Sequence, residues 1–283
     1  MKLIDKPKKE VLDILIILKI DTTRKGVIQD IDSVVDILRE REALYVKKVD
    51  DNTLFEIPRE EVISSRVNKA KIISYYEYRI LNKPNGREFY DEIILSAPHD
   101  ICPYCSIRTV KTVDHFLPKS EYPSYSITPT NLVPSCRDCN TDKKISFPTN
   151  KKDQTFHPYF DKVDNISWIS AELQKTEPLS FLYKVIKPEW WDDTIYDRAC
   201  CHFEGYNINQ LFSNEADREL RGMQHQFKKL HSKDKNLLKA HLLETYDSCL
   251  NGLGILDWKT LMYQELSTNE WFLDGCIGVN FFE

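Results

Sequence analysis

The chain has 283 residues, of which 41% are hydrophobic and 29% are charged. This composition is typical of a folded protein with one to three domains, and it excludes a disordered or fibrous chain. The sequence contains no run of roughly eighteen apolar residues, the length that a membrane-spanning helix needs. The N-terminus has no signal-peptide pattern. We therefore expect a cytoplasmic protein with reduced thiols. The net charge of −5 argues against a protein that coats nucleic acid through bulk electrostatics.

Residues 1–96 are predicted to form an N-terminal helical domain with a hairpin. Apolar residues at helical spacing predict helices over 8–19 and 28–41, a long helix that begins at Pro58, and a further helix over about 88–95. Between them, 44–46 and 54–57 flank turn residues and predict the hairpin. This order is also compatible with a winged-helix DNA-binding domain, but the pattern is so common that a plain scaffold is favoured.

The central region, residues 97–163, contains two Cys-x2-Cys pairs. These are Cys102 with Cys105 and Cys136 with Cys139. Each pair can direct two sulfurs at one ion, and two pairs complete a tetrahedral zinc shell. Because four thiolates leave no open coordination position, we expect a structural zinc ion.

Polar residues of catalytic type lie between and beside the cysteine pairs. Asp114 and His115 are adjacent in the chain. Asn131 begins the segment Asn-Leu-Val-Pro-Ser that leads to Cys136, and Asn140 directly follows Cys139. A neutral imidazole can take a proton from water, and a carboxylate can hold a hard divalent cation. The Asn131 amide could fix a loop, and the Asn140 oxygen could be a second metal ligand. Taken alone, each asparagine would be interpreted as a turn or cap residue.

The central region is locally basic. The stretch from Cys102 to Lys152 has eight basic and four acidic side chains, a net charge of +4 in an acidic chain. This distribution fits a focused phosphate site. Lys143 and Lys144 are candidate phosphate-binding residues, with a solvated helix face as the equal alternative.

Residues 164–283 are predicted to form an α-rich C-terminal domain. Strands and turns are expected around 168–170 and 179–186, followed by helices over about 214–231, 234–250 and 257–266. No catalytic motif occurs in this part of the sequence, which favours a domain that packs against the central region.

The order of the central motifs resembles the HNH endonuclease family. The motifs are Cys-x2-Cys, Asp-His-x-x-Pro-Lys and Asn-Leu-Val-Pro-x-Cys-x-x-Cys-Asn, and the match extends from Cys102 to about Lys152. The resemblance implies an α+β, mostly helical chain around a ββα-metal core. It also implies that Asp114 is a metal ligand, His115 the general base, Asn131 the loop-fixing residue and Asn140 the final ligand position.

The chain departs from the strict family pattern at Asn140, where a histidine is commoner. The resemblance implies that members with asparagine there are active with Mg²⁺ or Mn²⁺, and an amide oxygen suits such hard cations. The segment from His157 to Asp161 resembles bacterial HNH proteins associated with phage defence. We interpret it as a packing motif at the domain boundary.

The sequence thus predicts a metal-dependent endonuclease that hydrolyses phosphodiester bonds of nucleic acid, with DNA as the expected substrate. An effector role in bacterial anti-phage defence, with a regulatory partner such as an ATPase, adds to this hypothesis. The competing interpretation is a non-catalytic zinc-binding module that recognises nucleic acid or a partner protein. Such a module would need the cysteines but not Asp114, His115 and Asn140 together.

Overall fold

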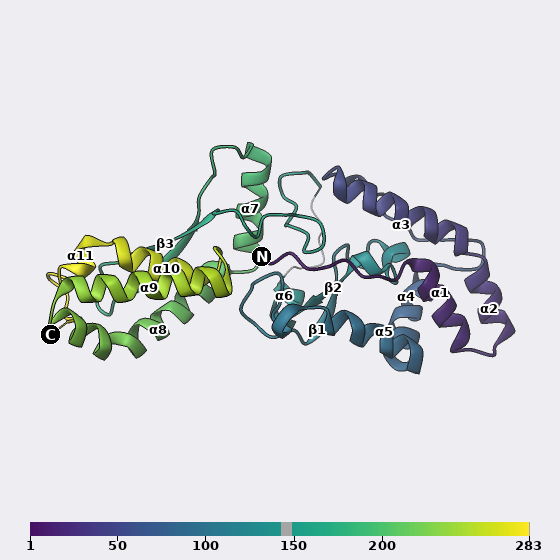
Figure 1. Cartoon of the computed structure of the whole chain (residues 1–283). Coiled ribbons are helices and arrows are strands. Elements are labelled where there is room, and N and C mark those ends of the chain that lie inside the picture. The colour runs from purple at the N-terminus through teal and green to yellow at the C-terminus, as the bar shows by residue number, and fades with distance from the viewer. Residues whose placement is uncertain (143–148, 283) are drawn as a thin grey trace. The chain divides into compact units, whose positions relative to one another are not determined.

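A computed structural model describes residues 1–142 and 149–282 (Figure 1). The chain divides into two compact units, Lys2–Asp161 and Lys162–Glu283, the second of which includes Met1. The division into three domains, with boundaries after residues 96 and 163, stays a prediction. Within the described residues, no helix combines the length and apolar character that a membrane span requires.

The unit Lys2–Asp161 begins with a series of helices. Its α-helices before the cysteine pairs are α1 (Val11–Ile20), α2 (Lys25–Asp32), α3 (Val35–Asp50), α4 (Lys69–Ser74) and α5 (Pro84–Leu95). A π-helical segment, η2 (Tyr75–Ile80), continues α4. Short 3₁₀ turns are η1 (Leu54–Glu56), η3 (Pro98–Asp100), η4 (Pro123–Tyr125) and η5 (Pro129–Asn131). The helix expected over 8–19 is confirmed as α1.

The hairpin predicted for 44–46 and 54–57 is wrong, because α3 continues through the first of these segments to Asp50. Leu38, Tyr45 and Val49 are its buried residues, and they recur at helical spacing on one face. A short apolar triplet does not by itself distinguish a strand from a buried helix segment. A winged-helix domain requires a β-hairpin as its wing, so the absence of a hairpin at 44–57 removes the support for that interpretation.

Two predicted helices are interrupted by serine and asparagine side chains. The helix expected over 28–41 is split between α2 and α3, where Ser33 Oγ donates to the Asp30 carbonyl oxygen at 2.7 Å. The long helix expected from Pro58 begins only at Lys69. Ser64 Oγ accepts the Val67 amide at 3.1 Å, and Asn68 caps α4 by accepting the Lys71 amide at 3.0 Å. These side chains compete with the helical backbone for its own hydrogen-bonding groups.

The central region forms a ββα arrangement. Strands β1 (Thr112–His115) and β2 (Leu132–Ser135) pair antiparallel, and helix α6 (Arg137–Asp142) follows directly and packs against β1. Figure 1 shows these elements beside α5, which contacts both strands. Val113 and Leu132 are part of the same hydrophobic core as residues of α1 and α5. The mostly helical fold with small two-stranded sheets that the sequence predicts is confirmed.

The unit Lys162–Glu283 contains a second antiparallel sheet and a group of helices. Its elements are β3 (Ile169–Gln174), β4 (Ser180–Val185), α7 (Asp193–Gly205), α8 (Ile208–His231), α9 (Lys235–Leu253), α10 (Trp258–Thr268) and α11 (Glu270–Leu273). The three helices that the sequence predicts here correspond to α8, α9 and α10. Helix α7 was not predicted. Its missed signal is Asp192, whose side chain caps it by accepting the Ile195 amide at 2.8 Å.

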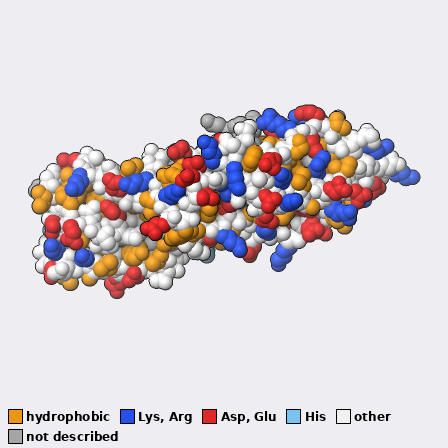
Figure 2. All heavy atoms as spheres, turned by 90° about the horizontal axis from the view of Figure 1, so that it is seen from above, with side chains coloured by type: hydrophobic (Ala, Val, Ile, Leu, Met, Phe, Trp, Pro, Cys, Tyr) orange, Lys and Arg blue, Asp and Glu red, His pale blue; other side chains and the backbone are white. Residues whose placement is uncertain are grey.

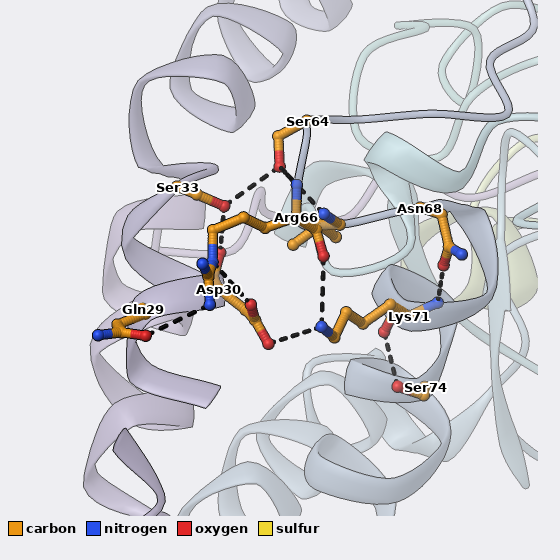
Figure 3. A network of polar contacts seen from close by, with 9 residues as sticks. Gln29, Asp30, Ser33, Ser64, Arg66, Asn68, Lys71 and Ser74 are labelled. Atoms are coloured by element: carbon orange, nitrogen blue, oxygen red, sulfur yellow. Dashed lines mark hydrogen bonds and ion pairs between the residues drawn. The ribbon is translucent and has the colours of Figure 1, made fainter. Parts of the chain in front are cut away.

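A buried carboxylate ties α2 to α4 and to the segment before it (Figure 3). Asp30 accepts from Arg66 Nε at 3.1 Å and pairs with Lys71 Nζ at 2.6 Å, and only 9% of its side chain is exposed. Ser33 Oγ and Ser64 Oγ lie 3.1 Å apart beside it. The hydrogen bond from Lys71, together with Arg66, lowers the pKa of Asp30 below its ordinary value. The ionised carboxylate therefore stabilises this junction.

Replacing Asp30 with asparagine should lower the free energy of unfolding at pH 7 by about 1–3 kcal/mol, because two charge-assisted contacts are lost. Since the folded pKa of Asp30 is lowered, its contribution is present above the unfolded pKa of about 4 and disappears as the pH falls through the folded value. Denaturant titrations of both proteins across pH measure this effect. Asp32→Asn, which removes a surface pair with Lys19, should cost less than about 1 kcal/mol. Equal losses for the two variants would contradict the role of Asp30.

Candidate metal centre and active site

The four cysteines of the two pairs converge on one point. The Sγ atoms of Cys102, Cys105, Cys136 and Cys139 all lie within 4.8 Å of one another, and all four residues are buried. A tetrahedral zinc ion with Zn–S bonds of about 2.3 Å holds its sulfurs about 3.8 Å apart. The cluster therefore fits the zinc shell that the sequence predicts.

Backbone hydrogen bonds shape each cysteine pair into a tight turn. In the first pair, the Cys102 amide donates to the Arg108 carbonyl at 2.8 Å, and the Ser106 amide donates to the Cys102 carbonyl at 2.8 Å. Ser106 adopts a left-handed conformation with φ of 59°, which turns the chain back. In the second pair, the Cys139 amide donates to Cys136 Sγ at 3.4 Å. Both turns thus present their sulfurs inward.

The thiols of the cluster shift one another's pKa in opposite directions: hydrogen bonds with Cys102 and Cys105 raise the pKa values of Cys136 and Cys139. Hydrogen bonds from Cys102, Cys136 and Cys139 hold the pKa of Cys105 well below the ordinary range of a thiol. A thiolate is the form that binds a metal ion. Four thiolates so close together repel one another, so a zinc ion would supply the positive charge that lets all four ionise.

Asp114 and His115 lie at the end of β1, opposite Val133 and Leu132 of β2. Asp114 is buried, and its Oδ2 accepts a hydrogen bond from the hydroxyl of Tyr104 at 2.9 Å. This bond fixes the carboxylate beside the first cysteine pair.

His115 is held by the backbone of the loop between the strands. Its Nε2 lies 2.9 Å from the Ser126 carbonyl oxygen, and the ring of Tyr76 packs edge-on against it with centroids 4.3 Å apart. A carbonyl oxygen can only accept, so Nε2 carries the proton. Nδ1 is then the nitrogen with the basic lone pair, which gives His115 the tautomer of a general base.

Asn131 binds two parts of the loop to each other. Its Oδ1 accepts the Leu117 amide at 2.7 Å, while its Nδ2 donates to the carbonyls of Leu117 at 3.1 Å and Tyr125 at 3.0 Å. The residue is fully buried. Because Tyr125 immediately precedes Ser126, these bonds also hold the carbonyl that orients His115. A loop-fixing residue would make such contacts, and the role that the resemblance implies for Asn131 stays a prediction.

Asn140 lies on α6 and is exposed. Its backbone amide donates a hydrogen bond to the Cys136 carbonyl at 3.2 Å. Its place on a helix that packs against β1 agrees with a ligand position, and its role stays a prediction. Lys143 and Lys144 lie outside the described residues, so their phosphate-binding role also stays a prediction.

His157 is a buried packing residue. Its ring stacks on Phe116 with centroids 4.0 Å apart, its Nδ1 accepts the Tyr159 amide at 3.2 Å, and its Nε2 lies 2.9 Å from the Tyr45 hydroxyl. Asp161 Oδ2 accepts the His157 amide at 2.6 Å. Because Phe116 follows His115 directly, this packing supports the end of β1. The interpretation of the segment as a packing motif agrees with these contacts.

Sequence reasoning missed two aromatic residues that contact the site. Tyr104 lies within the first Cys-x2-Cys pair, so its position between two ligands was an available signal. Tyr76 lies in the π-helical segment η2, and only the folded structure brings it to His115.

Comparison with known proteins points to the same region of the chain as the geometry does. Residues 102–145 match the model of the family described as HNH endonuclease. Protein ea31 of Escherichia phage lambda is 33% identical over 230 residues, covering 76% of this chain and 77% of that protein. The chain therefore belongs to the HNH endonuclease family, as its sequence predicts.

A second relative matches over a shorter stretch. The Septu protein PtuB of Bacillus thuringiensis is 32% identical over 85 residues, which are 28% of this chain and 32% of that protein. No solved structure shows a significant match to the chain.

Elemental analysis of the purified protein should give about one tightly bound zinc ion per chain. Replacing Cys136 with serine should lower zinc content, solubility and melting temperature, because zinc binding contributes directly to folding free energy. Cys249→Ser, a change of the same kind at a buried cysteine outside the cluster, should retain the zinc. If the parent protein is purified without metal and still shows the cooperative melting of a folded protein, the zinc assignment is refuted.

Proposed function

We propose that this protein is a metal-dependent endonuclease that hydrolyses phosphodiester bonds of nucleic acid, with DNA as its expected substrate. The observation that carries the proposal is the hydrogen bond from His115 Nε2 to the Ser126 carbonyl, which leaves Nδ1 as the basic nitrogen of a residue that directly follows the buried Asp114 in the chain. A zinc-binding module that only recognises a partner has no use for a histidine held in this tautomer. This contrast favours the nuclease over the non-catalytic alternative.

In the proposed reaction, His115 Nδ1 accepts a proton from the attacking water. The water oxygen forms a bond to phosphorus as the bond from phosphorus to the 3′ oxygen breaks, and the leaving oxygen takes a proton from solvent. Asp114 and Asn140 would hold the divalent cation, Mg²⁺ or Mn²⁺, and both offer the oxygen donors that such cations prefer. When bound, the cation stabilises the negative charge that develops on the phosphate and the leaving oxygen. Asn131 keeps the loop, and with it the Ser126 carbonyl, in place.

The charge distribution supports a local phosphate site. On the face shown in Figure 2, lysine and arginine side chains are interspersed with aspartate and glutamate side chains. The stretch from Cys102 to Lys152 is nevertheless basic within a chain of net charge −5. Such a distribution favours binding of a few phosphates near the site over a long electrostatic track.

We extend the proposal to an effector role in bacterial anti-phage defence, with a regulatory partner such as an ATPase. Its support is the resemblance stated for the segment His157–Asp161 and the similarity of part of the chain to the Septu protein PtuB. Co-purification from the native host, followed by mass spectrometry and cleavage assays on the assembly, tests this extension.

His115→Ala should abolish Mg²⁺- or Mn²⁺-dependent cleavage of supercoiled plasmid. A positioned general base contributes about two to four orders of magnitude in rate, and the zinc content and melting temperature should stay close to those of the parent. The matched control is His225→Ala, which removes an exposed histidine of α8 and should cleave as the parent does. Both variants pass through the same purification, which excludes a contaminating nuclease. Cleavage by His115→Ala at the parental rate would show that another residue is the base.

Asn140→His should change the metal preference without destroying cleavage. Imidazole is a softer donor than an amide oxygen, so Ni²⁺ and Co²⁺ should gain in rate relative to Mg²⁺. Initial cleavage rates across a metal series at matched pH measure the change. If rates and ranking are both unchanged, Asn140 does not contact the cation.

A further inference from the structure

Tyr104 links the four-cysteine cluster to the carboxylate of Asp114. The residue lies between Cys102 and Cys105, is fully buried, and donates its hydroxyl hydrogen to Asp114 Oδ2 at 2.9 Å. The amide of Lys2 donates to the Pro103 carbonyl at 2.9 Å and so holds this turn from outside. The position of the hydroxyl is therefore determined by the turn that carries two of the cysteines.

Strand pairing fixes the backbone of Asp114 but not the direction of its carboxylate. Its pairing with Val133 sets the Cα position and the face of the sheet, while rotation about the side-chain bonds remains to be fixed. A donor at 2.9 Å on one oxygen selects the orientation of the carboxylate plane. Because a phenol is neutral, its hydrogen bond orients the carboxylate without adding an opposing charge.

We propose that Tyr104 is a positioning residue that sets the affinity of the catalytic cation by orienting Asp114. The proposal rests on the proposed function, in which Asp114 is a cation ligand. It assigns the cysteine cluster a second task besides folding, since the same turn that binds zinc also directs the carboxylate. Hydrogen-bonding partners of metal ligands typically change metal affinity by about 10- to 100-fold when they are removed.

The test is Tyr104→Phe, which removes one hydroxyl and retains the buried ring. Binding of Mn²⁺ to the zinc-loaded protein is measured by the electron paramagnetic resonance signal of the free ion, with no nucleic acid present. We expect the Mn²⁺ dissociation constant to rise by about 10- to 100-fold. The midpoint of the Mn²⁺ dependence of cleavage should move with it, while zinc content is retained and the melting temperature stays within about 5 °C of the parent.

The matched control is Tyr159→Phe. This tyrosine is also buried and donates its hydroxyl to the Leu132 carbonyl of β2 at 2.8 Å, so the variant loses a comparable hydrogen bond that does not involve the carboxylate. It should bind Mn²⁺ as the parent does. A parental Mn²⁺ affinity in Tyr104→Phe, or an equal loss in both variants, overturns the positioning role. Loss of zinc or of the folded state in Tyr104→Phe also overturns it, because Tyr104 would then serve the cysteine turn itself.

Asp114→Asn separates this proposal from the proposed function. If the parent binds Mn²⁺ no better than Asp114→Asn does, Asp114 is not a cation ligand. The proposed function is then refuted, and the role of Tyr104 with it. If Asp114→Asn weakens binding and Tyr104→Phe does not, the cation site stands and only the role of Tyr104 is refuted.

Discussion

The convergence of four cysteines is the constraint on which the central region depends. The strands β1 and β2 have four residues each, and a two-stranded sheet of that size is not stable alone in water. The first cysteine pair precedes β1 and the second follows β2. One zinc ion bound to both pairs would therefore link the start of β1 to the end of β2. Packing of Val113 and Leu132 into the core shared with α5 provides the other support. Removal of either support would release the strand that carries Asp114 and His115.

The helices before the central region support the loop between β1 and β2. Glu60 accepts a hydrogen bond from Ser124 Oγ and pairs with Arg41 of α3. Ser124 lies two residues before Ser126, whose carbonyl orients His115. The ring of Tyr45, also on α3, packs against Tyr125 with centroids 5.4 Å apart. The N-terminal helices thus hold the loop that determines which nitrogen of His115 can act as a base.

The sequence predicts the local motifs better than their surroundings. Ligand spacing alone identifies the four-cysteine cluster, because two Cys-x2-Cys turns leave few other arrangements. Long amphipathic helices such as α8 and α9 are also predicted, since their periodicity extends over many residues. The hairpin error at 44–46 has the opposite cause, a short apolar triplet whose helical environment is set by tertiary packing. The edge-on contact of Tyr76 with His115 joins segments far apart in the chain, and no local pattern encodes it.

The two proposed cation ligands differ in how firmly they are held. Asp114 is buried, paired across the sheet and hydrogen-bonded to Tyr104, whereas Asn140 is exposed on the short helix α6. A charged ligand in a fixed orientation loses little freedom when a cation binds, so it contributes mainly to affinity. A neutral amide on an exposed helix contributes less charge and can adjust to ions of different size. In the proposed site, Asp114 would therefore determine how tightly a divalent cation binds, and Asn140 would determine which cation is preferred.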